Sequence, residues 1–191
     1  VRLFREVVFF ESLFHSAKWT WLFGWLFHFA LLLAFFRHLR YATDPVWFWV
    51  SWEIVQAAGH YAAYMMLLGL IGLLVRRIFV DRVRHISAPS DYLILILIIG
   101  IALSGLMMKW YPTDIFALKQ FIIGLIYFSW SELPSDFMLL LHLGLVILLM
   151  IIFPYSKLLH APGLFFSPTR NQTDTARDSR HIADWARKLE S

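Results

Sequence analysis

The sequence contains no cysteine, and only 16% of its 191 residues are charged. Without thiolates, this chain cannot itself ligate an iron–sulfur cluster, form a disulfide or build a cysteine-based zinc site. Soluble domains carry about 25% charged residues, so the low charge content argues against a soluble globular fold. The 60% hydrophobic content, nine Trp and eighteen Phe instead indicate an integral membrane protein with aromatic interfaces. The net charge of +4 does not indicate a nucleic-acid partner.

Four segments have the roughly 20 mostly apolar residues that a membrane-spanning helix needs. They are residues 19–36, 54–75, 92–108 and 137–153. The apolar stretch FIIGLIYFSW at 121–130 is too short to cross, and predicts an interfacial or re-entrant helix in which Thr113 caps the start. The expected fold is an all-α transmembrane helix bundle at 1–160 with this interfacial helix between the last two spans, followed by a C-terminal tail at 161–191. Because the first residue is Val1, we expect an N-terminal segment, such as a further span, to be missing.

The basic residues are distributed unequally across the membrane. With four spans, one side holds the N-terminal segment, the loop between the second and third spans, and the C-terminal tail. Thirteen of the 17 Lys and Arg residues lie on this side, and only Arg37, Arg40, Lys109 and Lys119 lie on the other. The positive-inside rule therefore predicts a multi-pass protein of the cell membrane with a cytoplasmic C-terminus. The first and last spans are then antiparallel.

Histidines in the first and last spans are the main candidates for function, because ionisable groups are costly in hydrocarbon. His28 and His38 lie in or at the end of the first apolar run, His142 lies near the start of the last span, and His160 follows its end. Antiparallel order brings His28 to the level of His160 near the cytoplasm. It brings His38 to the level of His142 near the outside. Two imidazole pairs at two depths suit two stacked b-type haems, whose iron takes one ligand on each side.

The spacing of the histidines does not match well between the two spans. His28 and His38 are ten residues apart, which is roughly 15 Å of helix, whereas His142 and His160 are eighteen apart, roughly 27 Å. Helix tilt and a bend at Pro154 would have to absorb the difference.

Other interpretations of the same histidines remain open. Any one of them, taken alone, fits an ordinary interhelix hydrogen-bonding group as well as a ligand. A zinc site would need all four at one depth, and a carboxylate di-metal site is disfavoured because the apolar cores of the first and last spans lack Asp and Glu. A haem-free membrane anchor is the rival function. A proton-relay transporter would need acidic residues near the middle of the membrane, which the spans lack.

The paired spacings, with RRIFVDRVR after the second span and FPYSKLLH after the last, resemble the dihaem cytochrome b of the respiratory nitrate reductase gamma-subunit family. That family usually has five spans. Within it, FFESLF, FGWLFHF, RHLRY and HAPGLFFSPTRN are most similar to DsrM, the membrane cytochrome of the sulfite-reduction-associated DsrMKJOP complex. The gamma subunit of a nitrate reductase and the cytochrome of a heterodisulfide-reductase-like complex are the alternatives within the family.

The resemblance implies two haem b groups as cofactors. His28 and His160 would bind the proximal haem, and His38 and His142 the distal haem. Electrons would pass between menaquinone and a cytoplasmic iron–sulfur partner, DsrK-like in a complex of dissimilatory sulfur metabolism. The chain would be an electron-transfer subunit of such a complex rather than a complete enzyme.

Further residues are candidates for supporting roles. Arg76 and Arg77 close the second span, and Arg37 flanks His38; their guanidinium groups suit haem propionates. His60 lies near the outer end of the second span, at about the depth of His38, where an imidazole can accept a proton from a quinol. The lysine that the family uses at its quinol site is not evident in this sequence.

Overall fold

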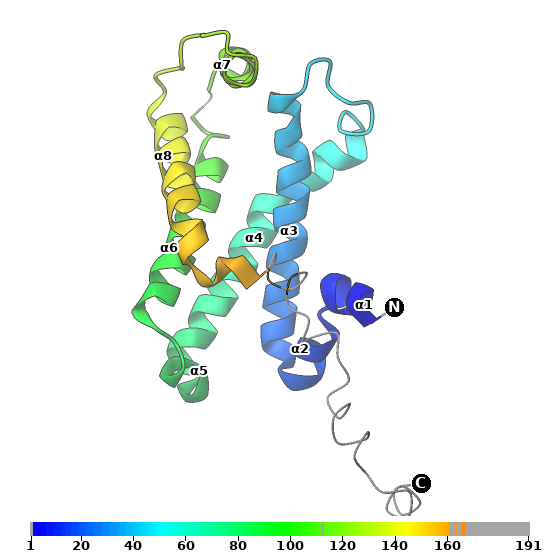
Figure 1. Cartoon of the computed structure of the whole chain (residues 1–191), viewed down its shortest axis with the longest axis vertical. Helices are drawn as coiled ribbons and strands as arrows, with labels where there is room; N and C mark the ends of the chain where they lie inside the picture. Colours follow the sequence, from blue (N-terminus) through cyan, green and yellow to red (C-terminus); the bar gives the residue numbers. More distant parts are fainter. Residues whose placement is uncertain (1, 112, 161–162, 164–165, 167–191) are drawn as a thin grey trace, which may run out of the picture. The chain divides into compact units, whose positions relative to one another are not determined.

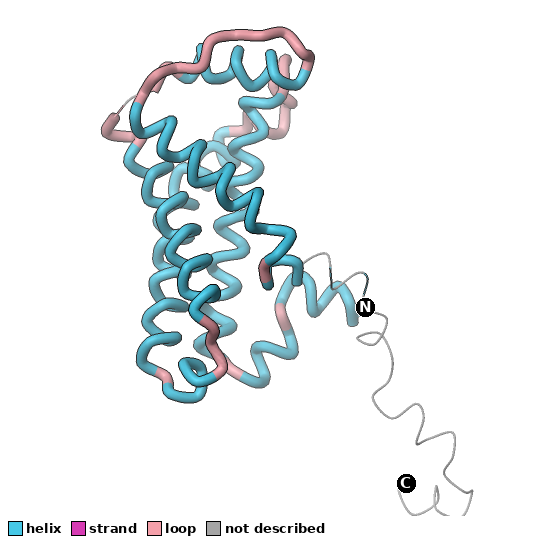
Figure 2. Tube along the Cα trace, turned by 60° about the vertical axis from the view of Figure 1, so that its left-hand side comes forward, coloured by secondary structure: helices cyan, strands magenta, loops and turns pink. Residues whose placement is uncertain are grey.

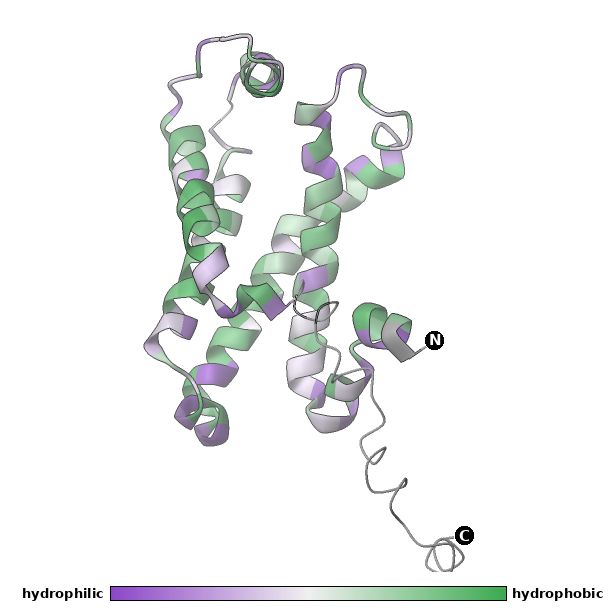
Figure 3. Cartoon of the chain, in the orientation of Figure 1, coloured by the Kyte–Doolittle hydropathy of each residue, from purple (hydrophilic) through white to green (hydrophobic). Residues whose placement is uncertain are grey.

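The computed structural model describes residues 2–111, 113–160, 163 and 166. Every regular element in these residues is a helix, which confirms the predicted all-α membrane bundle (Figures 1 and 2). Apolar residues cover most of the long helices (Figure 3). Four helices are long and apolar enough to cross a membrane, and they coincide with the predicted spans: α3 (Lys18–Ala42), α4 (Glu53–Phe79), α6 (Pro89–Met107) and α8 (Phe137–Ile152).

Shorter helices surround these spans. They are α1 (Arg2–Phe9), α2 (Glu11–Ser16), α5 (Asp81–His85), α7 (Ile115–Ile126) and the 3-10 helices η1 (Phe153–Tyr155) and η2 (Lys157–Leu159). α1 and α2 are held on the start of α3 by two indoles: Trp21 Nε1 donates to the Phe9 carbonyl over 2.7 Å, and Trp25 Nε1 to the Val8 carbonyl over 3.0 Å. These carbonyls end α1, so the indoles satisfy acceptors that a helix end leaves unpaired.

Glycines allow α3 and α4 to pack closely as antiparallel neighbours. A Cβ added at Gly69 would lie 2.9 Å from the Phe23 carbonyl oxygen and 2.9 Å from the Phe27 nitrogen. At the other end of the pair, a Cβ at Gly59 would lie 2.8 Å from the Arg37 Cβ. Without a hydrophobic driving force between helices in lipid, such close backbone approach is a main source of packing energy. The seam therefore depends on the small residues of α4.

The remaining spans follow in chain order, with α6 packed on α4 and α8 packed on α6. α6 is also antiparallel to α8, because a Cβ added at Gly105 would contact His142 and one at Gly100 would contact Leu145. Leu95, Ile98, Ala102 and Leu106 of α6 are buried. α3 and α8, the first and last spans, are not an extensively packed pair.

The interfacial helix is present as α7, but its predicted cap is wrong. Asp114, not Thr113, is the N-cap: its Oδ1 accepts from the backbone N–H groups of Phe116 and Ala117, each over 3.0 Å. A carboxylate also favours the positive end of the helix dipole, which a threonine hydroxyl does not. Figures 1 and 2 show α7 lying across the direction of the long helices, and Lys119 pairs with Asp44 in the α3–α4 loop at 2.8 Å.

The chain divides into two units, Val1–Ile152 and Phe153–Ser191. The division falls where α8 ends and η1 begins, next to Pro154, which cannot continue an α-helical hydrogen-bond ladder. Most of the predicted tail at 161–191 lies outside the described residues, so the domain boundary after residue 160 stays a prediction.

Candidate functional site

The predicted outer pair, His38 of α3 and His142 of α8, comes together in the structure. The ring centroids are 6.4 Å apart, and the ring planes are within 17° of parallel. An imidazole nitrogen binds a metal at roughly 2 Å and lies about 1 Å from its ring centre, so two imidazoles on opposite sides of one iron have centres roughly 6 Å apart. The separation of His38 and His142 agrees with this value.

Both rings use Nδ1 for a hydrogen bond within the protein. His38 Nδ1 lies 2.6 Å from the Ala34 carbonyl oxygen, one turn earlier on α3. His142 Nδ1 lies 3.0 Å from the hydroxyl oxygen of Ser104 on α6. Metal-binding histidines usually donate one ring N–H to such an acceptor, which fixes the ring and directs the other nitrogen to the metal. Nε2 is therefore the nitrogen of each ring that suits iron.

The donor set fits a haem better than a bare metal ion. Among the described residues, no group of three or more His, Cys, Asp or Glu is placed to hold a metal. A b-type haem needs only two protein ligands, because the porphyrin supplies the other four nitrogens. His38 and His142 meet that requirement.

The predicted inner pair is not tested by the structure. His28 is half-buried on α3; its Nδ1 lies 2.7 Å from the Gly24 carbonyl oxygen, and its ring packs edge-on against Phe10 and Phe27 at centroid distances of 5.1 and 4.8 Å. His160 belongs to the second unit, where its Nδ1 lies 3.0 Å from the Lys157 carbonyl oxygen. The pairing of His28 with His160 therefore stays a prediction.

A hydrogen bond from Nδ1 to a backbone carbonyl does not by itself identify a haem ligand. His85 of α5 makes the same contact, with its Nδ1 2.7 Å from the Asp81 carbonyl oxygen, and it is exposed outside the spans. What distinguishes His38 and His142 is that each has a second imidazole, with its ring centroid 6.4 Å away.

His60 has a partner that the sequence did not suggest. Lys109, just beyond α6, places Nζ 3.1 Å from His60 Nε2, 3.3 Å from the His60 carbonyl oxygen and 4.5 Å from the ring centroid of Tyr64. The predicted depth of His60 agrees with the neighbouring contact between Gly59 and Arg37. The start of α4 meets the end of α6 because these helices are antiparallel. The antiparallel order of the spans therefore indicates that Lys109 lies near His60.

Arg37 and Arg40, near the C-terminal end of α3, make hydrogen bonds within the protein, and Arg37 is also a predicted propionate ligand. Arg37 Nη1 donates to the Gln56 carbonyl oxygen and Arg40 Nη1 to Gln56 Oε1, both over 3.1 Å. Since a guanidinium carries five N–H donors, these bonds orient each group without exhausting it. At the other end of α4, Arg76 and Arg77 are half-buried, and the Arg77 guanidinium lies 5.8 Å from the ring centroid of Tyr92. Propionate binding by Arg37, Arg76 and Arg77 stays a prediction.

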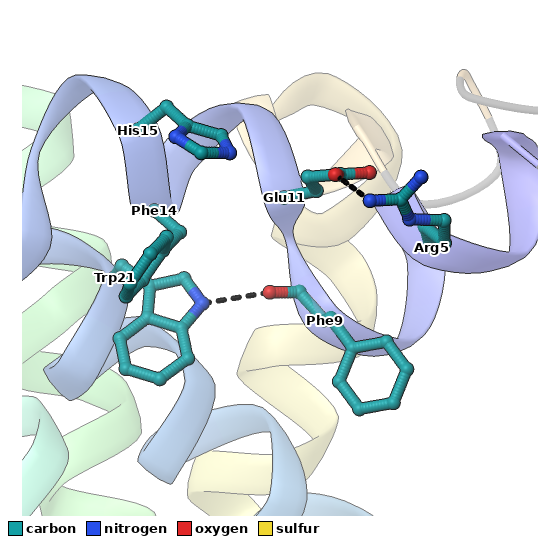
Figure 4. A pocket seen from close by; sticks show the side chains of 6 residues that line it. All are labelled: Arg5, Phe9, Glu11, Phe14, His15 and Trp21. Atoms are coloured by element: carbon teal, nitrogen blue, oxygen red, sulfur yellow. Dashed lines mark hydrogen bonds and ion pairs between the residues drawn. The ribbon is translucent and has the colours of Figure 1, made fainter.

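A hollow of about 370 Å³ lies at the N-terminal end of α3, away from the His38–His142 pair. Figure 4 shows the Arg5–Glu11 ion pair and the Trp21 indole bonded to the Phe9 carbonyl on its walls. Phe14 and His15 complete the lining. It contains none of the predicted haem or quinone residues.

Comparison with known proteins identifies the family. A sequence profile of the nitrate reductase gamma subunit family matches residues 11–176. The chain is similar to the Hdr-like menaquinol oxidoreductase cytochrome b-like subunits of Archaeoglobus fulgidus (37% identity over 210 residues, 96% of this chain and 63% of the relative) and Archaeoglobus profundus (34% over 187 residues, 89% and 55%). It thus spans less than two thirds of the length of either relative. With most of its length matched by the family profile, the chain belongs to the nitrate reductase gamma subunit family.

Proposed function

We propose that this chain is the haem b subunit of a menaquinol-linked oxidoreductase complex in the cell membrane, with its C-terminus in the cytoplasm. The observation that carries the proposal is the separation of 6.4 Å between the rings of His38 and His142. These two residues would hold the distal haem, and His28 and His160 the proximal haem. Bound haem b would supply one-electron transfer between the quinone and a partner subunit.

The partner we infer is a cytoplasmic iron–sulfur subunit, because this chain has no cysteine with which to hold a cluster itself. Both Archaeoglobus relatives are named as subunits of Hdr-like menaquinol oxidoreductases. Those names favour a heterodisulfide-reductase-like partner, a class to which a DsrK-like subunit also belongs. A DsrM-like role in dissimilatory sulfur metabolism is the more specific form of the proposal.

The quinone would bind beside His60 and Lys109, at the end of the bundle that carries the His38–His142 pair. Gly59 packs on Arg37, and Gly105, one turn before Lys109, packs on His142. In the resting site the Lys109 ammonium donates to His60 Nε2. A quinol oxygen would replace His60 as the acceptor of Lys109. His60 Nε2 is then released to take the quinol proton, and the ammonium stabilises the negative charge that develops on oxygen.

Haem content is the first test of this function. Chain purified in detergent after expression with ample haem is assayed by the pyridine haemochrome method and by reduced-minus-oxidised spectra. We expect near two b haems per chain. Folded protein without haem would exclude electron transfer and favour the second candidate, a haem-free membrane anchor. One haem would leave only one of the two histidine pairs as a ligand set.

The quinone site is tested separately by His60→Ala and Lys109→Gln, with Lys119→Gln as the control. Lys119 lies ten residues further along the chain, in α7, and its Nζ pairs with Asp44 instead of a histidine. We expect reduction of haem by a soluble menaquinol analogue to slow at least tenfold in the two site variants and to be unchanged in the control. Reduction by dithionite should be unaffected in all three. Equal quinol-linked rates in Lys109→Gln and wild type would remove Lys109 from the site.

A further inference from the structure

The ring of His142 is oriented by a different helix from its own. Its Nδ1 lies 3.0 Å from Ser104 Oγ of α6, whereas His38 uses the Ala34 carbonyl of its own helix. Ser104 is only 4% exposed, which is unusual for a polar side chain in an otherwise apolar span. A buried hydroxyl is stable there only when its hydrogen-bonding capacity is used.

The hydrogen bonds of Ser104 determine where His142 carries its proton. Ser104 Oγ donates to the Ile101 carbonyl oxygen over 3.0 Å. A hydroxyl has one hydrogen, so toward His142 the oxygen can act only as an acceptor. The Ile101 backbone also hydrogen-bonds His142, and a carbonyl can only accept. Both contacts on α6 therefore favour the neutral imidazole with its proton on Nδ1 and a lone pair on Nε2. This is the tautomer that binds a metal through Nε2.

α6 also fixes where the ring of His142 lies. A Cβ added at Gly105 would meet His142 Cε1 at 3.1 Å and Nδ1 at 3.5 Å. The first distance is tighter than ordinary van der Waals contact, so the ring rests on the bare backbone of this residue. Ser104 and Gly105 are adjacent in the chain, and one provides the acceptor while the other provides the space.

We propose that Ser104 is a positioning residue for His142: through Nδ1 it fixes the tautomer and orientation of this axial ligand and tunes the electron density at Nε2. The inference rests on the proposed function, because it assumes that His142 ligates the distal haem. A hydrogen bond donated from Nδ1–H makes the imidazole a more basic ligand, and a more basic ligand stabilises ferric over ferrous iron. Through Ser104, α6 would thereby raise or lower the reduction potential of a haem held by His142.

The test compares Ser104→Ala and Ser104→Thr with Ser87→Ala in the full-length chain. Ser87 is a matched control, because its Oγ also donates to a backbone carbonyl, that of Val83, over 2.7 Å. Unlike Ser104, it has no hydrogen bond to a histidine among those of the described residues. Potentiometric titration gives the midpoint potential of each haem, and EPR gives the g-values of the low-spin ferric centres. In Ser104→Ala we expect one haem, and only one, to rise in potential with a change in its g-values. Ser104→Thr, which keeps the hydroxyl, and Ser87→Ala should both match the wild type.

Each result decides the inference. Ser104→Ala with unchanged potential and g-values would overturn it while leaving the haem function intact, and a wild type without haem would instead refute both. If Ser104→Ala loses the haem altogether, the threonine variant decides: retention of a wild-type centre supports the hydroxyl as the cause, and loss in both variants contradicts it. Gly105→Ala keeps the hydroxyl but moves the ring, and should alter the same centre as Ser104→Ala; an effect on the other centre would contradict the assignment.

Discussion

The two predicted histidine pairs differ in whether both members belong to the same structural unit. His38 and His142 both belong to the first unit, and their rings are already at the separation of two ligands of one iron. His28 instead packs between Phe10 and Phe27, and its predicted partner His160 lies in the second unit, after two short 3-10 helices.

The difference shows when the order of helices along a chain is enough to predict a site. Two residues within regular antiparallel helices have positions fixed by the rise of 1.5 Å per residue and by the packing of the spans. A residue beyond a proline-broken helix end has no such constraint. The sequence therefore constrains the distance between His38 and His142 more tightly than the distance between His28 and His160.

The largest expected effect is the loss of one haem when either His38 or His142 is replaced. We expect His38→Ala and His142→Ala each to retain about one of two haems, because a haem with a single axial ligand binds weakly. His85→Ala, which removes a histidine with the same kind of Nδ1 bond outside the spans, should retain both. Haem per chain by pyridine haemochrome measures this. Full haem content in His142→Ala would remove it from the ligand set.

The inner pair is tested by His28→Ala and His160→Ala. Each should lose the other haem and leave the spectrum and g-values of the His38–His142 centre unchanged. EPR on the purified variants distinguishes the two centres. If His28→Ala retains both haems while His160→Ala does not, the proximal haem has a different second ligand.

Several features of the site were predictable and others were not, for physical reasons. The spans follow from apolar runs of sufficient length, and the depth of His60 follows from the antiparallel order. The charge of Lys109 alone gives no sign of a site, but the antiparallel order of the spans places it against His60. Ser104 gives no signal in an apolar run, because one hydroxyl does not change the hydropathy of a span. The choice of Asp114 over Thr113 as the cap of α7 depends on where the first helical turn begins, which residue type alone does not fix.

A smaller effect should follow from pushing apart α3 and α4, because α3 carries one histidine of each predicted pair. At Gly69→Ala the new Cβ meets backbone atoms of Phe23 and Phe27 at 2.9 Å, and overpacking of this kind costs about 1–3 kcal/mol. The better helix propensity of Ala offsets up to about 1 kcal/mol of that. We expect a lower thermal midpoint and weaker retention of both haems. Gly100→Ala, whose Cβ would lie 3.5 Å from Leu145, is the control and should be neutral or slightly stabilising.

The smallest effect concerns α7, which lies near the C-terminal end of α3. Asp114→Ala removes the N-cap and should destabilise the helix by about 1 kcal/mol, whereas Thr113→Ala removes a hydroxyl whose oxygen is buried without a hydrogen-bond partner and should be neutral or stabilising. Amide hydrogen exchange in α7 measures both. Faster exchange in Thr113→Ala than in Asp114→Ala would reverse the assignment of the cap.

The most direct test of the central claim is the haem content of the double variant His38→Ala/His142→Ala beside the two single variants. If the two imidazoles bind one iron, the double variant loses no more than either single variant, and all three retain about one haem. A double variant that loses both haems, from single variants that each lose a different one, would show that His38 and His142 belong to separate sites.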